Sequence, residues 1–115
     1  MLDSKLQIKS GQTLALVNNP DQVDVAAPQA APDAANAILV FAKNRAELEQ
    51  RIDLLREAAQ RGALTWLAYP KARQLETDLN RDIIRDLALD RGLDPVRQVS
   101  IDDIWSALRC GRPRR

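Results

Sequence analysis

Tyr69, Pro70 and Lys71 form the segment of this chain whose residue types come closest to those of a reactive site. A phenol and an ammonium group could exchange protons with a substrate, but lysine acts as a base only where burial lowers its pKa substantially. The alternative is that Pro70 ends a strand and Lys71 keeps its charge in water while its stem covers apolar surface. A nucleophile at Ser106 would need Lys71 as its base, because the 115-residue chain has no histidine. We favour the structural alternatives and predict no catalytic residue.

The absence of histidine and the single cysteine exclude much of the chemistry that small enzymes use. Without histidine there is no Ser-His-Asp triad, no Cys-His dyad and no imidazole ligand for a metal. Cys110 alone forms neither an internal disulfide nor a paired-cysteine zinc site. Asp102 and Asp103 could join Asp78 or Asp82 around Mg²⁺, but no spacing enforces such a cluster, and adjacent aspartates are common in turns. We therefore expect neither a metal nor a cofactor.

Three turns contain polar residues that suit an anionic ligand. They lie at 18–21, 43–44 and 69–71, each directly after an apolar run that predicts a buried strand. The carboxyl ends of parallel strands meet at one edge of a sheet, where ligands bind, and a helix that begins nearby adds free N–H groups. The candidate anion-binding residues are Asn18, Asn19, Asn44, Tyr69, Lys71 and Arg81.

A purely structural alternative exists for the same segment. Thr77 or Asp78 could cap the second helix, and Asp78 and Asp82 would then balance the nearby cations.

Apolar runs and turn residues predict the elements that must position these side chains. Strands are expected at 12–17, 37–42, 63–69, 96–101 and 104–109, with a short edge strand at 22–26. One helix is expected to begin at Asn44, whose pairing with Glu47 is typical of a capping box, and to stop at Gly62. A second helix is expected to begin at Thr77 or Asp78 and to stop at Gly92.

The order of these elements predicts an α/β fold. Strands that alternate with capped helices imply right-handed crossovers and parallel pairing, whereas the two-residue turn at 102–103 makes the last two strands antiparallel. We expect a small, mostly parallel sheet with helices on its faces and an antiparallel C-terminal pair. Residues 1–110 would form one domain and residues 111–115 a basic, flexible tail. Trp66 and Trp105 are expected in the core, on neighbouring strands.

Four segments carry a resemblance to a family of small bacterial proteins of unknown function. They contain the patterns W-x-x-Y-P-K, T-D-x-x-R-D and W-S-A-L-R, and they lie at 43–48, 66–71, 77–82 and 102–109. The resemblance spans residues 5–110 and implies a truncated methyltransferase-type, Rossmann-like fold without an established activity. This chain departs from true methyltransferases because its first strand runs into Asn18, Asn19, Pro20 and Asp21 rather than a glycine-rich turn. Only Asp24 could serve as an acidic ribose ligand, and it fits poorly, so we expect no adenosylmethionine site.

Charge and composition leave three functional hypotheses. The first is a non-catalytic binding or interaction domain, which an edge strand could join into a homodimer. The second is a domain that binds a small molecule or anion, or an undetected enzyme, at the carboxyl-end edge of the sheet. The third is a nucleic-acid accessory protein that uses Arg109, Arg112, Arg114 and Arg115, but net charge is only +1 and no aromatic residue lies among these arginines to stack a base. We therefore do not favour nucleic acid as a partner.

The N-terminal segment and the apolar runs bear on location. Residues 1–9 have no apolar signal core, and no stretch reaches the roughly 20 apolar residues that a membrane span needs. The sequence therefore predicts a cytoplasmic protein, most simply a bacterial one, that does not associate with membranes.

Overall fold

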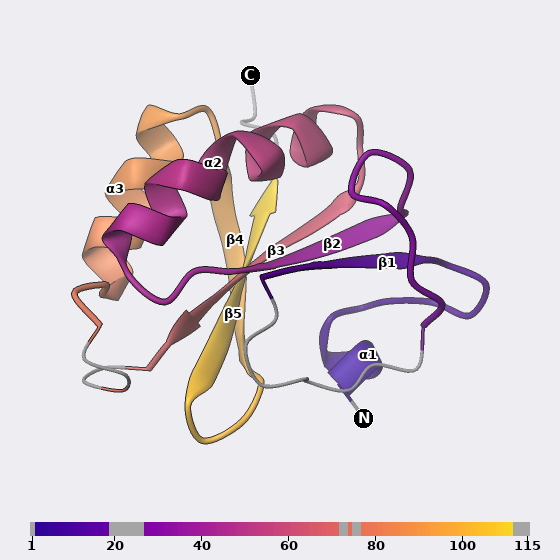
Figure 1. Cartoon of the computed structure of the whole chain (residues 1–115), viewed down its shortest axis with the longest axis horizontal. Helices are drawn as coiled ribbons and strands as arrows, with labels where there is room; N and C mark the ends of the chain where they lie inside the picture. The colour runs from indigo at the N-terminus through magenta and orange to yellow at the C-terminus, as the bar shows by residue number, and fades with distance from the viewer. Residues whose placement is uncertain (1, 19–26, 72–73, 75–76, 112–115) are drawn as a thin grey trace.

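The computed structural model describes residues 2–18, 27–71, 74 and 77–111, with the side chains of residues 2 and 3 left out. In chain order the elements are α1 (Leu2–Lys5), β1 (Leu14–Val17), β2 (Ala37–Phe41), α2 (Arg45–Gln60), β3 (Leu64–Pro70), α3 (Arg81–Asp90), β4 (Asp94–Ser100) and β5 (Trp105–Gly111). The α/β class is confirmed (Figure 1). The edge strand expected at 22–26 lies outside the described residues. None of the helices in the described segments is long and apolar enough to span a membrane.

The five strands form one sheet in the order β1-β2-β3-β5-β4. β1, β2 and β3 pair in parallel, whereas β5 pairs antiparallel with both β3 and β4. The antiparallel C-terminal pair is confirmed. The prediction of a mostly parallel sheet is wrong. β5, the second strand of the hairpin, lies between β3 and β4, so β3 and β4 do not pair in parallel and β5 pairs antiparallel with both.

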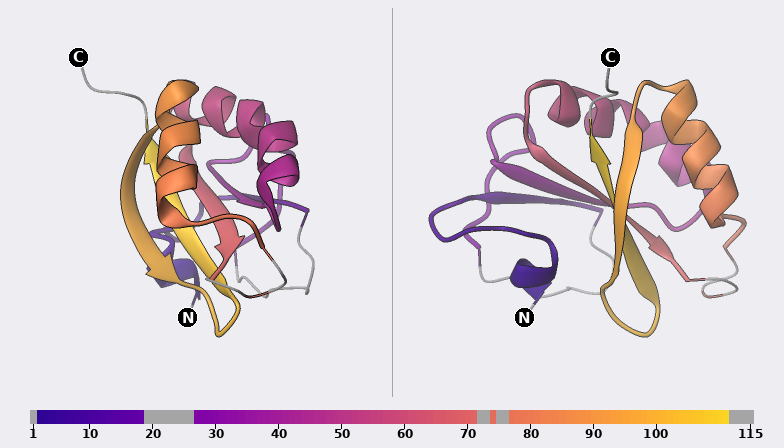
Figure 2. Two further views of the ribbon diagram at one scale, coloured as in Figure 1. Left: turned by 90° about the vertical axis from the view of Figure 1, so that its left-hand side faces the viewer. Right: turned by 180° about the vertical axis from the view of Figure 1, so that it is seen from behind.

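Helices α2 and α3 lie together on one face of the sheet (Figure 2). The crossovers from β2 to β3 and from β3 to β4 advance in the same direction across the sheet, and right-handed crossovers in one direction place their helices on the same side. The expectation of long helices on both faces is therefore wrong for the described chain. The opposite face packs against the N-terminal segment, where Leu6 is fully buried and its carbonyl oxygen accepts a hydrogen bond from Trp66 Nε1 at 2.9 Å.

Aromatic residues form the core of that opposite face. Trp66 and Trp105 are buried on the neighbouring strands β3 and β5, as predicted, and the ring of Phe41 meets that of Trp105 edge to face with centroids 5.1 Å apart. Alternation along β5 places Trp105 and Ala107 on this face, and it places Ser106 on the face that α2 and α3 cover. The sheet therefore turns Phe41, Trp66 and Trp105 away from the two long helices.

Helix α2 begins and ends where its sequence predicts. Asn44 is the N-cap, with its Oδ1 accepting a hydrogen bond from the Glu47 N–H at 3.0 Å, and Glu47 Oε1 accepts one from the Lys43 N–H at 2.8 Å. The Asn44 cap is confirmed, but Glu47 accepts from the N–H of Lys43, one residue before the N-cap, so the contact differs from a standard capping box. Gly62 follows the helix with a φ of 85°, a conformation that favours glycine.

Candidate functional site

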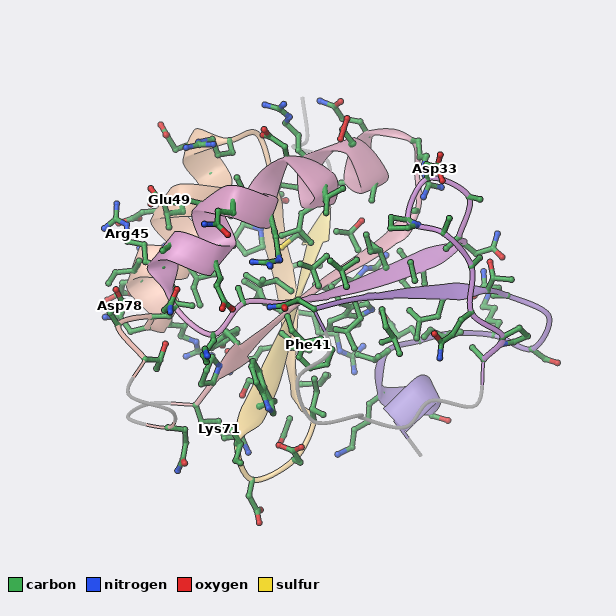
Figure 3. The ribbon with its side chains drawn as sticks, in the orientation of Figure 1. Asp33, Phe41, Arg45, Glu49, Lys71 and Asp78 are labelled. Atoms are coloured by element: carbon green, nitrogen blue, oxygen red, sulfur yellow. The ribbon has the colours of Figure 1, made fainter. Side chains whose placement is uncertain are left out.

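A hollow of about 460 Å³ lies where the carboxyl end of β3 meets the first turn of α3. β4 and β5 complete its floor, because the sheet order places β5 beside β3 and β4 beyond it. The residues that line it are Tyr69, Pro70, Lys71, Leu79, Asn80, Arg81, Gln98 and Ser106. Three of the predicted anion-binding residues, Tyr69, Lys71 and Arg81, are thus brought together (Figure 3 labels Lys71 at the end of β3).

Two nearly buried hydroxyl groups belong to this hollow. Tyr69 and Ser106 are register partners across β3 and β5, and they are only 5% and 4% exposed. Neither side chain has a hydrogen-bond partner within the part of the chain that the structure describes. All fully enclosed side-chain nitrogen and oxygen atoms of those residues do have partners. The two hydroxyl oxygens therefore keep contact with the open space of the hollow.

The two cations of the hollow are held by neutral oxygen atoms. Lys71 Nζ donates to Ser100 Oγ at 2.8 Å. The guanidinium of Arg81 donates twice to Gln98 Oε1, from Nε at 3.0 Å and from a terminal nitrogen at 2.9 Å. Among the described residues no carboxylate lines the hollow, and the ion pairs found there include neither Lys71 nor Arg81. Two positive charges therefore remain without an acidic partner.

Burial determines the protonation state of Tyr69. Desolvation raises the pKa of its phenol above the ordinary value of 10.0, and the nearby positive charge of Arg81 opposes that shift to a smaller extent. The phenol therefore stays protonated at neutral pH and acts as a hydrogen-bond donor. This state does not suit a general base.

The first turn of α3 differs from its prediction. The N-cap is Asn80, whose Oδ1 accepts from the Ile83 N–H at 2.9 Å, so the expected start at Thr77 or Asp78 is wrong. Thr77 instead accepts from the Leu79 N–H through its hydroxyl oxygen. The helix begins at the hollow itself, because Asn80 and Arg81 both line it.

Asp78 turns toward the other long helix. Its Oδ1 accepts a hydrogen bond from the Arg45 N–H at 2.8 Å, in the first turn of α2 (Figure 3). A carboxylate at a helix N-terminus is favourable, because the free N–H groups carry partial positive charge there. Asp78 therefore stabilises α2 and does not balance Arg81.

Two other predicted residues serve a structural contact at the same edge of the sheet. Asn18, at a φ of 59°, donates from Nδ2 to the Phe41 carbonyl at 3.1 Å and to Glu47 Oε1 at 3.2 Å. Asn44 caps α2, as described above. Neither residue lines the hollow, and Asn19 lies outside the described residues.

Sequence reasoning missed the roles of Ser106 and Gln98 in the hollow. Ser106 was considered only as a nucleophile, although alternation along its strand already placed it on the face opposite Trp105. What the sequence lacked was the position of β5 beside β3, which brings Ser106 next to Tyr69. Gln98 carries no motif, and only the fold shows its contact with Arg81.

The remaining candidate residues have local structural roles or lie outside the description. Asp102 Oδ1 accepts from the N–H groups of Ile104 and Trp105, both at 2.8 Å, and so stabilises the turn between β4 and β5. Arg109 donates to Gln7 Oε1 at 2.9 Å. The arginines at 112, 114 and 115, on which the nucleic-acid hypothesis depends, lie outside the described residues.

Comparison of the chain with models of known protein families and with curated proteins gave no match. The geometry of the hollow therefore carries the functional argument.

Proposed function

We propose that this chain is a non-catalytic binding domain for a small anion, which it holds in the hollow at the start of α3. The observation that carries the proposal is the pair of nearly buried hydroxyl groups, Tyr69 and Ser106, that face the hollow without partners. Both hydroxyl oxygens are open to the hollow, so they are free to form hydrogen bonds with a ligand that enters it.

The polar groups around the hollow are nearly all hydrogen-bond donors. Gln98 Oε1 is occupied by Arg81 and Asn80 Oδ1 by the Ile83 N–H, which leaves the amide NH₂ groups of both residues available. The hydroxyls of Tyr69 and Ser106 and the cations Lys71 and Arg81 add further donors. A set of donors with two uncompensated positive charges favours a ligand that accepts hydrogen bonds and is negatively charged.

Binding rather than catalysis is favoured by the state of these groups. The Tyr69 phenol, whose ordinary pKa of 10.0 is raised further by burial, is protonated at neutral pH, and arginine does not lose its proton in proteins. Neither group offers a base to a bound substrate.

The topology also supports a structural relationship. We propose that the fold is a shortened form of the methyltransferase-type, Rossmann-like sheet. The supporting observation is the strand order: the reversed strand β5 lies between β3 and β4, so the sheet ends in an antiparallel pair of strands. In this proposal the ligand site is not that of adenosylmethionine, because the amide of Asn18, at the end of β1, is tied to Phe41 and Glu47.

Titration with inorganic phosphate tests the anion site. We expect phosphate to raise the melting temperature and to bind in calorimetry, and Arg81→Gln to weaken that binding about tenfold, because a hydrogen bond to a charged group contributes roughly 1.5–3 kcal/mol. Arg56→Gln is the matched control: it removes the same charge from α2, where Arg56 pairs with Asp53 at 3.3 Å outside the hollow. Absence of binding at tens of millimolar phosphate, or equal losses in both variants, would overturn the proposal.

A further inference from the structure

A second hollow of about 390 Å³ lies beside the first, between α3 and β4. Arg81 and Gln98 line both hollows, so their hydrogen-bonded side chains form the boundary between the two spaces. A ligand that binds Arg81 in the first hollow could therefore extend into the second hollow.

The second hollow differs from the first in chemical character. Pro95, Val96 and Leu108 give it an apolar surface, and α3 adds the guanidinium group of Arg85 and the carboxylate of Asp82. Arg97 also borders the hollow, but its register partner Arg109 lies on the face of the sheet that α3 does not cover. Val96 is 57% exposed, because the register of β4 shifts between Pro95 and Arg97 and leaves this residue in the irregularity. The planar guanidinium group of Arg85 beside an apolar surface favours a flat ring, on which arginine stacks well.

The charge of the first hollow favours a dianionic head group. Lys71 and Arg81 supply two positive charges there, and no acid of the described segments lines it. A phosphate monoester near neutral pH carries close to two negative charges and three terminal oxygen atoms, whereas a carboxylate carries one charge and two oxygen atoms.

We infer that the ligand is a phosphate monoester with an aromatic body, whose phosphate occupies the first hollow and whose ring occupies the second. This inference rests on the proposed anion-binding function. It adds the chemical class of the ligand and assigns a role to Val96 and Arg85, which no sequence motif singles out.

Three probes that are mainly dianions at pH 8 test the inference by calorimetry: inorganic phosphate, phenyl phosphate and glycerol 3-phosphate. We expect phenyl phosphate to bind about tenfold more tightly than inorganic phosphate, because burial of about half of the ring contributes an apolar gain of that size. Glycerol 3-phosphate, whose body is polar, should bind no more tightly than inorganic phosphate.

A surface variant locates the ring. Val96→Ser should reduce the advantage of phenyl phosphate about threefold and leave the affinity for inorganic phosphate unchanged. Leu89→Ser is the matched control, because Leu89 is similarly exposed, at 54%, and lines neither hollow.

The outcomes separate this inference from the function on which it rests. Equal affinities for phenyl phosphate and inorganic phosphate, both sensitive to Arg81→Gln, would overturn the aromatic body and leave the anion site standing. Loss of the phenyl advantage in Leu89→Ser but not in Val96→Ser would also overturn it. If none of the three phosphates bound, the anion site itself would fail.

Discussion

The two hydroxyl groups of the hollow give the anion-site proposal a signature in protein stability. Tyr69→Phe and Ser106→Ala each remove one hydroxyl and change little else in volume. Because neither group has a partner among the described residues, its removal costs the folded state no hydrogen bond. We expect both variants to be slightly more stable than the parent chain and to bind phosphate more weakly.

The magnitudes follow from the burial of these groups. A wholly buried polar group without a partner costs about 1–3 kcal/mol. The two residues as a whole are 5% and 4% exposed, but their hydroxyl oxygens are not fully enclosed, so the effect should fall below that range. We expect each variant to raise the free energy of unfolding by about 0.5–1 kcal/mol and to weaken phosphate binding about tenfold.

Thr65→Val is the matched control for stability. Thr65 is 1% exposed and lies on β3 like Tyr69, but its hydroxyl donates to the Ala63 carbonyl at 3.0 Å. Its loss should lower the free energy of unfolding by about 1 kcal/mol and leave phosphate binding unchanged. Urea unfolding is readily followed by tryptophan fluorescence, because Trp66 and Trp105 are buried.

One result would refute the reasoning directly. If Tyr69→Phe and Ser106→Ala destabilise the fold as much as Thr65→Val does, their hydroxyls have structural partners and are not free to bind a ligand. Unchanged phosphate affinity in both variants would refute it as well.

Two further predictions concern the elements around the site. Burial, and to a smaller extent the charge of Asp94, raises the pKa of the Cys110 thiol from 9.0 to about 12. The contribution of this protonated thiol to the free energy of unfolding is therefore fully present below pH 9 and is lost as pH rises toward 12. Between pH 8 and pH 10 the free energy of unfolding should fall by about 1.4 kcal/mol because of this group. In Cys110→Ala, measured under reducing conditions, that part of the fall should be absent. An identical pH dependence in the variant and the parent chain would contradict the raised pKa of Cys110. Asn80→Ala should lower the unfolding free energy by about 1 kcal/mol in urea, because the Ile83 N–H loses its acceptor, and an unchanged value would show that Asn80 does not cap α3.

Local signals were sufficient to predict most of the elements. The apolar runs of β1, β2 and β3 are buried strands, and the side chains of Asn44 and Glu47 begin α2 through contacts within four residues of the chain. The start of α3 was mispredicted because Asp78, a good capping residue by type, satisfies an N–H group 33 residues away at Arg45. A sequence pattern does not show such a tertiary competitor.

The arrangement of the strands accounts for what was missed at the site. The sequence predicts the hairpin of β4 and β5, but a hairpin can border β3 with either strand. Only the choice of β5 as the neighbour brings Ser106 beside Tyr69 and places Gln98 within reach of Arg81. Tyr69 lies at the end of β3, and Lys71 and Arg81 follow that strand along the chain, so these three predicted residues meet. The neutral residues beside them, Gln98, Ser100 and Ser106, belong to the C-terminal hairpin.

Two groups of polar residues lie at the same edge of the sheet. In one group the residues satisfy one another's hydrogen bonds, whereas the other group faces the hollow, and the two differ in where their carboxylates lie. At the ends of β1 and β2, the carboxylate of Glu47 accepts from Asn18 and from the Lys43 N–H, so the polar groups satisfy one another. At the end of β3, the carboxylate that a purely structural site would use, Asp78, is engaged at α2. Arg81 is left with the neutral oxygen of Gln98. The first turn of α3 also contains Asp82, but this acid lines the second hollow and not the first. Among the described residues the cations of the first hollow are therefore held by neutral oxygen atoms, which favours a ligand that brings the negative charge.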